Sequence, residues 1–205
     1  MTPAIARAST KGEETRAQIL AAAVEQASEG GFESLTIGGL AERTGLSKSG
    51  LFAHFGSRLE LQMAALDEAA RLFTEQVFLP AFRAPRGLKR LQALLDGWFD
   101  WPRRAKLPGG CPIDAATREY DHRPGPMREA VLERQRTLER ELAKTVRLAI
   151  DTGELAADTD PDEMAFALMG LILAYYRAQA TLGDEAAEKR ARAGFDRLIS
   201  LYRPH

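Results

Sequence analysis

Cys111 lies close in sequence to groups that could support thiol chemistry. Asp114, Asp121 and His122 follow it within a short stretch, and the start of a predicted helix beside the sulfur would favour a thiolate. No spacing fixes a base against the sulfur, and no oxyanion site can be recognised. A free cysteine is more commonly a small buried apolar residue. We predict no catalytic residues, although Cys111 with His122 is the one enzymatic arrangement to consider, and a redox sensor at Cys111 stays open.

The histidines do not suggest a metal site. The chain has three of them, His54, His122 and His205, and a single cysteine, which give no Cys/His cluster at ligand spacing. One cysteine also excludes an internal disulfide framework. We therefore predict no metal, zinc included, and no cofactor.

A second group of polar residues lies at helical spacing in the stretch Thr36–Phe55, TIGGLAERTGLSKSGLFAHF. Thr36 and Ser47 are N-cap types, and each begins a short predicted helix. Between these helices Gly45 supplies a residue that tolerates positive φ, as a tight turn between crossing helices requires. The stretch therefore predicts a helix-turn-helix.

The second of these helices has two distinct faces. Leu51 and Phe55 turn inward. The outward face carries small or polar side chains, namely those of Lys48, Ser49, Gly50, Ala53 and His54. A short polar face of this kind suits a helix that lies in the major groove of DNA.

The chain from Thr15 to about Leu66 resembles the N-terminal DNA-binding domain of the TetR family of bacterial transcriptional regulators. The matching positions are the helix Thr15 to Ser28, Gly31-Phe32, Leu35-Thr36-Ile37, Leu40-Ala41, Gly45-Leu46-Ser47, Leu51-Phe52, His54-Phe55, Ser57-Arg58 and Leu61. The resemblance implies contacts with the DNA backbone at Thr36, Lys48, Phe52, His54 and Arg58. It implies base reading at Lys48, Ser49, Gly50 and Ala53, with Ser47 beginning the recognition helix.

Two departures from the family pattern affect these residues. Phe52 replaces the usual tyrosine, so its ring can pack against sugar or a thymine methyl group but cannot donate a hydrogen bond. Gly38-Gly39 stands where many members carry a basic or polar residue, so we expect one contact to be lost. The alternative to DNA contact is core packing for Phe52 and His54. For Lys48 the alternative is a surface lysine that does not contact DNA.

The charge balance is unusual for a DNA-binding protein. The net charge is −1, and between Met1 and Glu60 acidic residues outnumber basic ones. The positions of the basic residues can compensate for their small number, because Lys48 and Arg58 flank the recognition helix and further basic residues lie near the N-terminus. We expect few cationic contacts and a shallow salt dependence of DNA binding.

No apolar stretch approaches the roughly 20 residues that cross a bilayer, and no signal peptide is recognisable. We therefore expect a cytoplasmic protein without a membrane partner. The expected fold is all-α, with a disordered arm over residues 1–14, the helix-turn-helix DNA-binding domain over 15–56 and a helical ligand-binding and dimerisation domain over 57–205. The pattern Ser57 to Glu60 is a capping box that begins a long linking helix ending near Phe73.

Loops rich in proline and glycine divide the rest of the chain into helices. The expected helices are Leu88 to about Arg104, Ile113 to Tyr120, Met127 to Asp151, Asp162 to Leu182 and Glu185 to Leu201. The last two carry wide apolar stripes, and TetR-like proteins usually dimerise by pairing two such helices with their copies. The expected interface residues are Phe166, Met169, Gly170, Leu173, Ala191, Phe195 and Leu198. The alternative is that these stripes only fill the core of their own subunit.

Aromatic and polarisable side chains gather in the middle of the second domain, where a cavity between helices could hold a small apolar molecule. The expected ligand-binding residues are Trp98, Trp101, Cys111, Ile113, Tyr120, Met127 and Tyr175. Plain core packing is the alternative for each of them. We therefore predict a homodimeric regulator, a repressor that binds a palindromic double-stranded operator and is released by an unidentified small-molecule effector. A DNA-binding protein without an effector remains the alternative.

Overall fold

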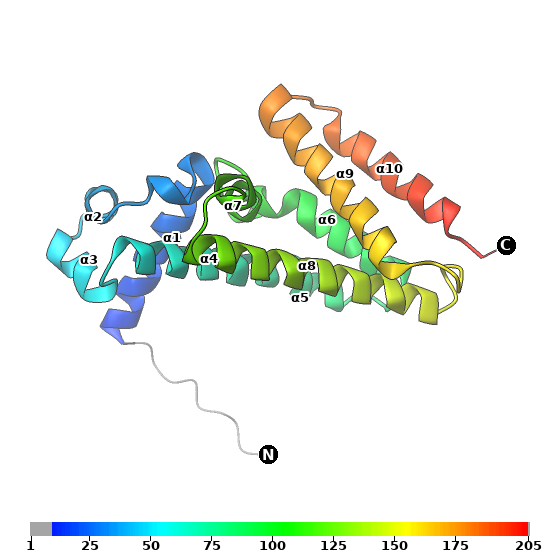
Figure 1. Cartoon of the computed structure of the whole chain (residues 1–205), viewed down its shortest axis with the longest axis horizontal. Coiled ribbons are helices and arrows are strands. Elements are labelled where there is room, and N and C mark those ends of the chain that lie inside the picture. The colour runs from blue at the N-terminus through cyan, green and yellow to red at the C-terminus, as the bar shows by residue number, and fades with distance from the viewer. Residues whose placement is uncertain (1–9, 205) are drawn as a thin grey trace, which may run out of the picture.

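The computed structural model describes residues 10–204, and within them it contains helices and no strand (Figure 1). The helix-turn-helix module lies at one end of an elongated molecule, and α4 and α8 run from it towards the opposite end. The elements are α1 (Lys11–Gly30), η1 (Phe32–Ser34), α2 (Ile37–Thr44), α3 (Lys48–His54), α4 (Arg58–Phe73), η2 (Thr74–Phe78), α5 (Leu79–Phe82), α6 (Leu88–Arg104), α7 (Pro112–Tyr120), α8 (Pro126–Asp151), α9 (Pro161–Leu182) and α10 (Ala187–Leu201). The prediction of an all-α fold is confirmed.

The first helix begins earlier than the apolar pattern predicts. Thr10 is its N-cap, because the Thr10 hydroxyl accepts from the amide of Glu13 at 3.2 Å while the Glu13 carboxylate accepts from the amide of Thr10 at 2.6 Å. This reciprocal pair satisfies two amides that a helix start otherwise leaves free. Lys11 is therefore helical, and the expected disordered arm does not extend to residue 14. Residues 1–9 of that arm lie outside the described residues.

The helix-turn-helix has the predicted local geometry. The Thr36 hydroxyl accepts from the amide of Gly39 at 3.0 Å, and the Ser47 hydroxyl accepts from the amide of Gly50 at 3.0 Å. Gly45 ends α2 in the left-handed region, with φ of 69°. Leu51 and Phe55 are almost completely buried, at 0% and 1% exposure. These contacts hold the turn between the two helices and leave the opposite face of α3 exposed.

Two hydrophobic cores meet along α4. The smaller core holds the helix-turn-helix, but it also takes in Tyr120 from α7 and Met127 and Val131 from α8. The first half of α4 belongs to this core through Leu61, whereas Phe73 belongs to the larger core of the second domain. The two domains are therefore packed against each other rather than joined by a free linker.

The start of α4 differs slightly from the predicted capping box. The Ser57 hydroxyl accepts from the amide of Glu60 at 3.1 Å, as predicted, but the Glu60 carboxylate accepts from the amide of Gly56 at 3.1 Å. Both bonds hold the start of the helix that leads out of the DNA-binding module. The remaining predicted helices of the second domain agree with α6 to α10 within two residues at each end.

The expectation that no apolar stretch approaches the length of a membrane span does not hold for α9. Of the described helices, only α9 is long and apolar enough to pass a test for a membrane span, with a mean hydropathy of 1.2 and 33% of the tested window buried. Length and composition alone are weak evidence, because the core helix of a soluble protein passes the same test. Met164, Leu168 and Ile172 of α9 are buried in the larger core. The apolar character of this helix is thus partly explained by its packing.

Candidate functional site

The outward face of α3 is accessible as the helix-turn-helix prediction requires. Ser47, Lys48, Ser49 and Ala53 are exposed, together with Thr36 at the start of α2. Gly50 and His54 are half-buried. Phe52 is 54% exposed, so core packing within the subunit does not account for this large apolar ring.

Lys48 lies directly over Gly38 of α2. A Cβ atom built on Gly38 would be 3.4 Å from Cε of Lys48 and 3.7 Å from its ammonium nitrogen, which shows how closely the lysine side chain passes over this glycine. Among the ion pairs of the described residues none involves Lys48. Its ammonium group therefore carries a charge that is free for an anionic partner.

Two other basic side chains of the module, those of Arg43 and Arg16, are already engaged. Arg43 forms ion pairs with Glu25 at 2.9 Å and Glu29 at 3.4 Å. The Arg16 guanidinium lies over the ring of Phe55, 4.8 Å from its centroid. These contacts leave few cations for phosphate groups, in agreement with the acidic balance of the sequence.

Arg58 is also held within the subunit. Its Nε donates to the carbonyl oxygen of Leu35 at 2.9 Å, and its guanidinium pairs with Glu33 at 3.0 Å. Arg58 remains exposed, and these contacts connect the start of α4 to the segment around η1.

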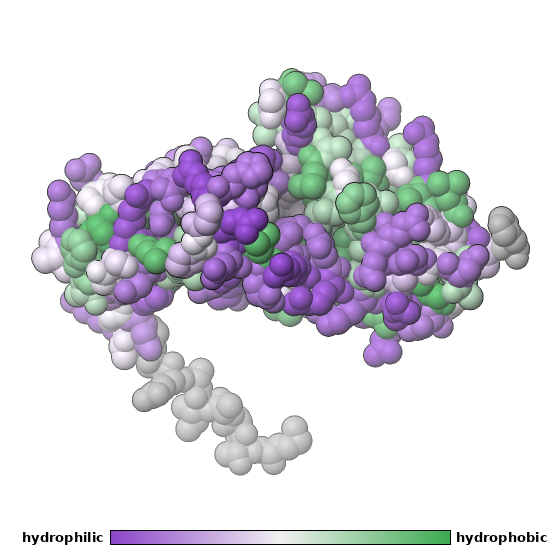
Figure 2. Space-filling model, viewed as in Figure 1, coloured by the Kyte–Doolittle hydropathy of each residue, from purple (hydrophilic) through white to green (hydrophobic). Residues whose placement is uncertain are grey.

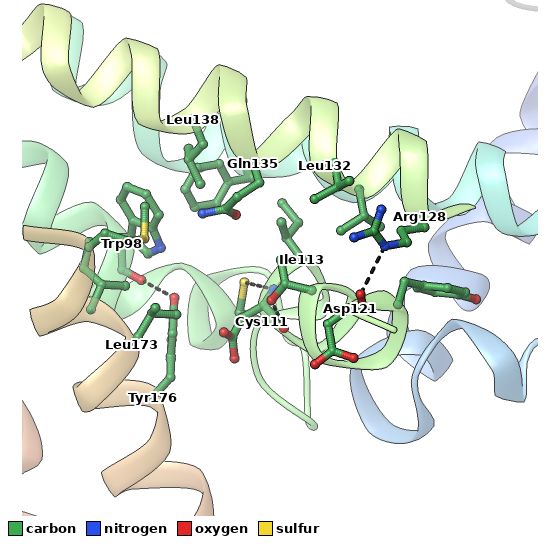
Figure 3. A pocket seen from close by; sticks show the side chains of 17 residues that line it. Trp98, Cys111, Ile113, Asp121, Arg128, Leu132, Gln135, Leu138, Leu173 and Tyr176 are labelled. Atoms are coloured by element: carbon green, nitrogen blue, oxygen red, sulfur yellow. Dashed lines mark hydrogen bonds between the residues drawn. The ribbon is translucent and has the colours of Figure 1, made fainter. Parts of the chain in front are cut away.

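A cavity of about 330 Å³ lies between α7, α8 and α9 (Figure 3). Four of the predicted ligand-binding residues line it, namely Trp98, Cys111, Ile113 and Tyr120. The other three lie elsewhere. Trp101 is fully buried against Phe73, Met127 belongs to the smaller core, and Tyr175 packs against Phe99 and lines an outer cleft between α6, α7 and α9.

One wall of the cavity was missed in the sequence. It is a single face of α8, formed by Arg128, Val131, Leu132, Gln135 and Leu138. Spacings of three and four residues place these side chains on one side of a helix. The signal was therefore present, but charged residues on both sides of it make this stretch look like an ordinary surface helix.

Cys111 is the N-cap of α7 rather than a reactive thiol. Its sulfur accepts from the amide of Asp114 at 3.4 Å, and the side chain is 8% exposed. Burial raises the pKa of the Cys111 thiol to about 12, so the group is protonated at neutral pH. The His122 side chain is 93% exposed and lies 3.8 Å from the Asp121 carboxylate, so it does not serve as a base for the buried sulfur.

The end of α7 is bonded to the DNA-binding module. The Glu119 carboxylate accepts from the amides of Phe32 at 2.7 Å and Glu33 at 2.8 Å. The next residue, Tyr120, donates from its hydroxyl to the Glu33 carboxylate at 2.8 Å. This hydrogen bond is the largest cause of a lowered pKa of Glu33, while burial and the nearby carboxylates raise the pKa of Tyr120. We call these contacts the α7 joint.

The loop before α7 touches the same module. The amide of Gly109 donates to the Ser28 hydroxyl at 3.2 Å, near the end of α1. A Cβ atom on Gly109 would lie 1.7 Å from the carbonyl oxygen of Ser28, so this approach requires a glycine. The segment that carries Cys111 and Ile113 along the cavity is thus held against the DNA-binding module at both ends.

The expected interface residues fall into two groups. Phe166, Gly170 and Leu173 are exposed on one face of α9, with Phe166 at 83% and Leu173 at 44%. Figure 2 shows hydrophobic residues gathered over α9 and the adjoining part of α10. Leu198 is half-buried, whereas Met169, Ala191 and Phe195 are buried in the core of their own subunit.

A helix-turn-helix with an exposed recognition helix, packed against a helical domain that contains a cavity, is typical of one-component DNA-binding regulators, in which one chain carries both domains. Comparison with protein families agrees with this class. Residues 19–64 match the family described as "Bacterial regulatory proteins, tetR family", and residues 87–195 match "Tetracyclin repressor-like, C-terminal domain". The chain belongs to the TetR family of transcriptional regulators.

A curated relative is the HTH-type transcriptional activator FasR of Mycolicibacterium smegmatis, which is 32% identical over 89 residues. That match covers 43% of this chain and 41% of the relative, so less than half of either protein is compared. Among solved structures, a TetR-family regulator from Cytophaga hutchinsonii has a TM-score of 0.84 at 18% identity, covering 97% of this chain and 100% of that chain. A TetR regulator from Chloroflexus aurantiacus J-10-FL has a TM-score of 0.81 at 25% identity, covering 93% and 94%.

Two further similar structures contain ligands. One is AibR in complex with isovaleryl coenzyme A and operator DNA, with a TM-score of 0.68 at 19% identity, covering 93% of this chain and 99% of that chain. The other is a regulator from Saccharomonospora viridis in complex with choline, with a TM-score of 0.76 at 21% identity, covering 91% and 96%. The ligands of these two structures differ greatly in size and charge.

Proposed function

We propose that the protein acts as a homodimer that represses transcription by binding a palindromic operator and that a small molecule in the cavity releases it. The observation that carries the proposal is the exposed face of α3, where Lys48 has no acidic partner among the described residues and Phe52 is 54% exposed. The proposed DNA contacts are Thr36, Ser47, Lys48, Ser49, Gly50, Phe52, Ala53, His54 and Arg58. Arg58 contributes to DNA binding mainly by fixing the start of α4, because its guanidinium is bound to Glu33 and Leu35.

The apolar face of α9 supports the homodimer. Phe166 and Leu173 are large apolar side chains exposed on one subunit, and Gly170 between them allows a second helix to approach closely. Two recognition helices related by two-fold symmetry read half-sites about 34 to 36 Å apart. We propose repression of transcription rather than activation. The relative FasR, by contrast, is named a transcriptional activator.

Two elements would transmit ligand binding to the DNA-binding module. The first is α4, whose first half lies in the smaller core and whose end at Phe73 lines the cavity. The second is α7, which lines the cavity and ends in the α7 joint. A ligand that favours a different placement of either element shifts the population towards dimers whose recognition helices are wrongly spaced.

The alternatives have less support. A DNA-binding protein without an effector does not account for an apolar cavity that contacts both α4 and α7. A redox sensor at Cys111 conflicts with the burial and raised pKa of the thiol. An enzyme would need a base beside the sulfur, and His122 is exposed to solvent.

Replacing Lys48 by alanine tests the proposed DNA contact. By fluorescence anisotropy at fixed salt, we expect Lys48→Ala to weaken operator binding about 10-fold or more, because a charged contact at the start of the recognition helix is lost. Lys89→Ala removes the same charge from the exposed side of α6 and should bind like the wild type. Equal binding by all three proteins would contradict the proposed role of α3.

A further inference from the structure

The cavity is elongated along α8, and its two ends differ in polarity. Arg128 lies at one end and Leu138 at the other, and a rise of 1.5 Å per residue separates their positions by about 15 Å. Around Leu138 the wall is formed by Phe73, Trp98 and Met169, which are apolar and buried. A molecule that fills this space needs a long apolar part and can be polar at one end.

Arg128 is the charged group at the polar end. Figure 3 shows its guanidinium directed back towards Leu132 and the interior of the cavity. Its Nε donates to the carbonyl oxygen of Asp121 at 3.1 Å, which fixes the position of the group. Among the described ion pairs none includes Arg128, so its two terminal nitrogens have no carboxylate partner. An arginine with these free donors is suited to bind a carboxylate through two parallel hydrogen bonds.

The acidic residues of the cavity wall do not neutralise Arg128. Asp114 is paired with Arg118 at 2.6 Å, and this arginine reaches it from the solvent side. The Asp121 side chain is 56% exposed, and its nearest basic group is His122, at 3.8 Å. Arg128 therefore has no carboxylate partner among the residues that line the cavity.

We propose that the cavity binds an amphiphilic carboxylate, with the carboxylate on Arg128 and an unbranched alkyl chain lying along α8 towards Leu138 and Trp98. This inference rests on the proposed function of the cavity as an effector site and names the chemical class of the effector. Ile113 and Leu132 contact the middle of the chain, and Gln135 is the remaining polar group on that wall. The contact between Arg128 and Asp121 places the bound carboxylate next to the end of α7 and therefore next to the α7 joint.

The test is a direct binding titration of the full-length protein without DNA. Decanoate, decanol and decyltrimethylammonium serve as anionic, neutral and cationic probes of the same chain length, each below its critical micelle concentration. Binding is followed by calorimetry and by the fluorescence of Trp98 and Trp101. We expect saturable binding of decanoate, with one site per subunit and an affinity at least 10-fold above that of the other two probes.

Two variants locate the ends of the ligand. Arg128→Gln should weaken decanoate binding about 10-fold or more and leave decanol binding unchanged, whereas Arg140→Gln, the same change on an exposed part of α8, should alter neither. Leu138→Trp fills the apolar end and should abolish decanoate binding while retaining the shorter hexanoate. Unchanged decanoate binding by Arg128→Gln, a preference for the cationic probe, or no binding of decanoate would each overturn the proposal. Because no DNA is present, failure of this assay is separate from failure to bind an operator.

Discussion

The hydroxyl of Tyr120 donates a hydrogen bond of 2.8 Å to the Glu33 carboxylate, across 87 positions of the sequence. Tyr120 lines the cavity, whereas Glu33 lies in η1 of the DNA-binding module. A single side chain therefore contacts both the proposed ligand site and the proposed DNA-binding unit. Glu119 strengthens the connection, since its carboxylate holds the backbone amides of Phe32 and Glu33.

Tyr120→Phe removes only the hydroxyl from this connection. We expect the variant to bind the operator within about threefold of the wild type, because α3 is unchanged. The effect of a saturating effector should be reduced several-fold, since one of the contacts that transmit ligand binding is lost. Anisotropy titrations with and without effector measure the ratio of the two affinities, and an unchanged ratio would exclude Tyr120 from the coupling.

The same hydrogen bond predicts a dependence of stability on pH. The Tyr120 hydroxyl lowers the pKa of Glu33 below the ordinary value of 4.5. A carboxyl with a lowered pKa in the folded state stabilises the protein fully above its unfolded pKa and loses this contribution as the pH falls through its folded pKa. The difference in Tm between wild type and Tyr120→Phe should therefore be larger at pH 7 than at pH 3. Thermal unfolding followed by circular dichroism measures it, and an equal difference at both values would contradict this assignment.

Gly31 is predicted to be essential to the α7 joint. Its φ is +75°, and a Cβ atom built there would lie 2.8 Å from the Glu119 carboxylate. We expect Gly31→Ala to lower the free energy of unfolding by about 1 to 3 kcal/mol through backbone strain and the displaced carboxylate. Gly12→Ala, in the exposed first turn of α1, should instead be neutral or stabilising by up to about 1 kcal/mol. Chemical denaturation compares the two, and similar losses of stability in both variants would argue against a special role for Gly31.

The face of α9 should control the oligomeric state. Phe166→Glu introduces a charge at an exposed position, so the subunit should stay folded while the dimer dissociates. In Gly170→Ala the added Cβ meets no atom within 4 Å inside the subunit, so the fold should tolerate it. Light scattering coupled to gel filtration should give a dimeric mass for the wild type and a monomeric mass for Phe166→Glu. A monomeric wild type, or a dimeric Phe166→Glu, would exclude this face.

The local features of the fold could be predicted from the sequence because they depend on near neighbours. Thr36, Gly45 and Ser47 determine caps and a turn within a few residues of themselves. The first turn of α1 was missed even though Thr10 and Glu13 form a capping box, because no apolar stripe extends so far towards the N-terminus. Helix capping and apolar periodicity are separate signals, and the first turn of α1 carries only the capping signal.

The α7 joint and the wall of the cavity formed by α8 were not predicted in this way. Glu119 and Tyr120 bind groups that are 86 and 87 positions away, and no periodicity encodes such contacts. Arg128 looks like one of many charged residues on a long surface helix, and only the folded chain shows that this half-buried residue lines the cavity. Conversely, Trp101 is an aromatic residue of the kind expected in a ligand site, but its side chain is completely buried in the core.

Selection of bound fragments from random-sequence DNA, at fixed salt, directly tests operator recognition by α3. We expect enrichment of a palindrome whose half-sites are centred about 34 to 36 Å apart, and loss of that enrichment with Lys48→Ala but not with Lys89→Ala. Failure to enrich any sequence, or enrichment that survives Lys48→Ala, would contradict recognition of an operator by α3.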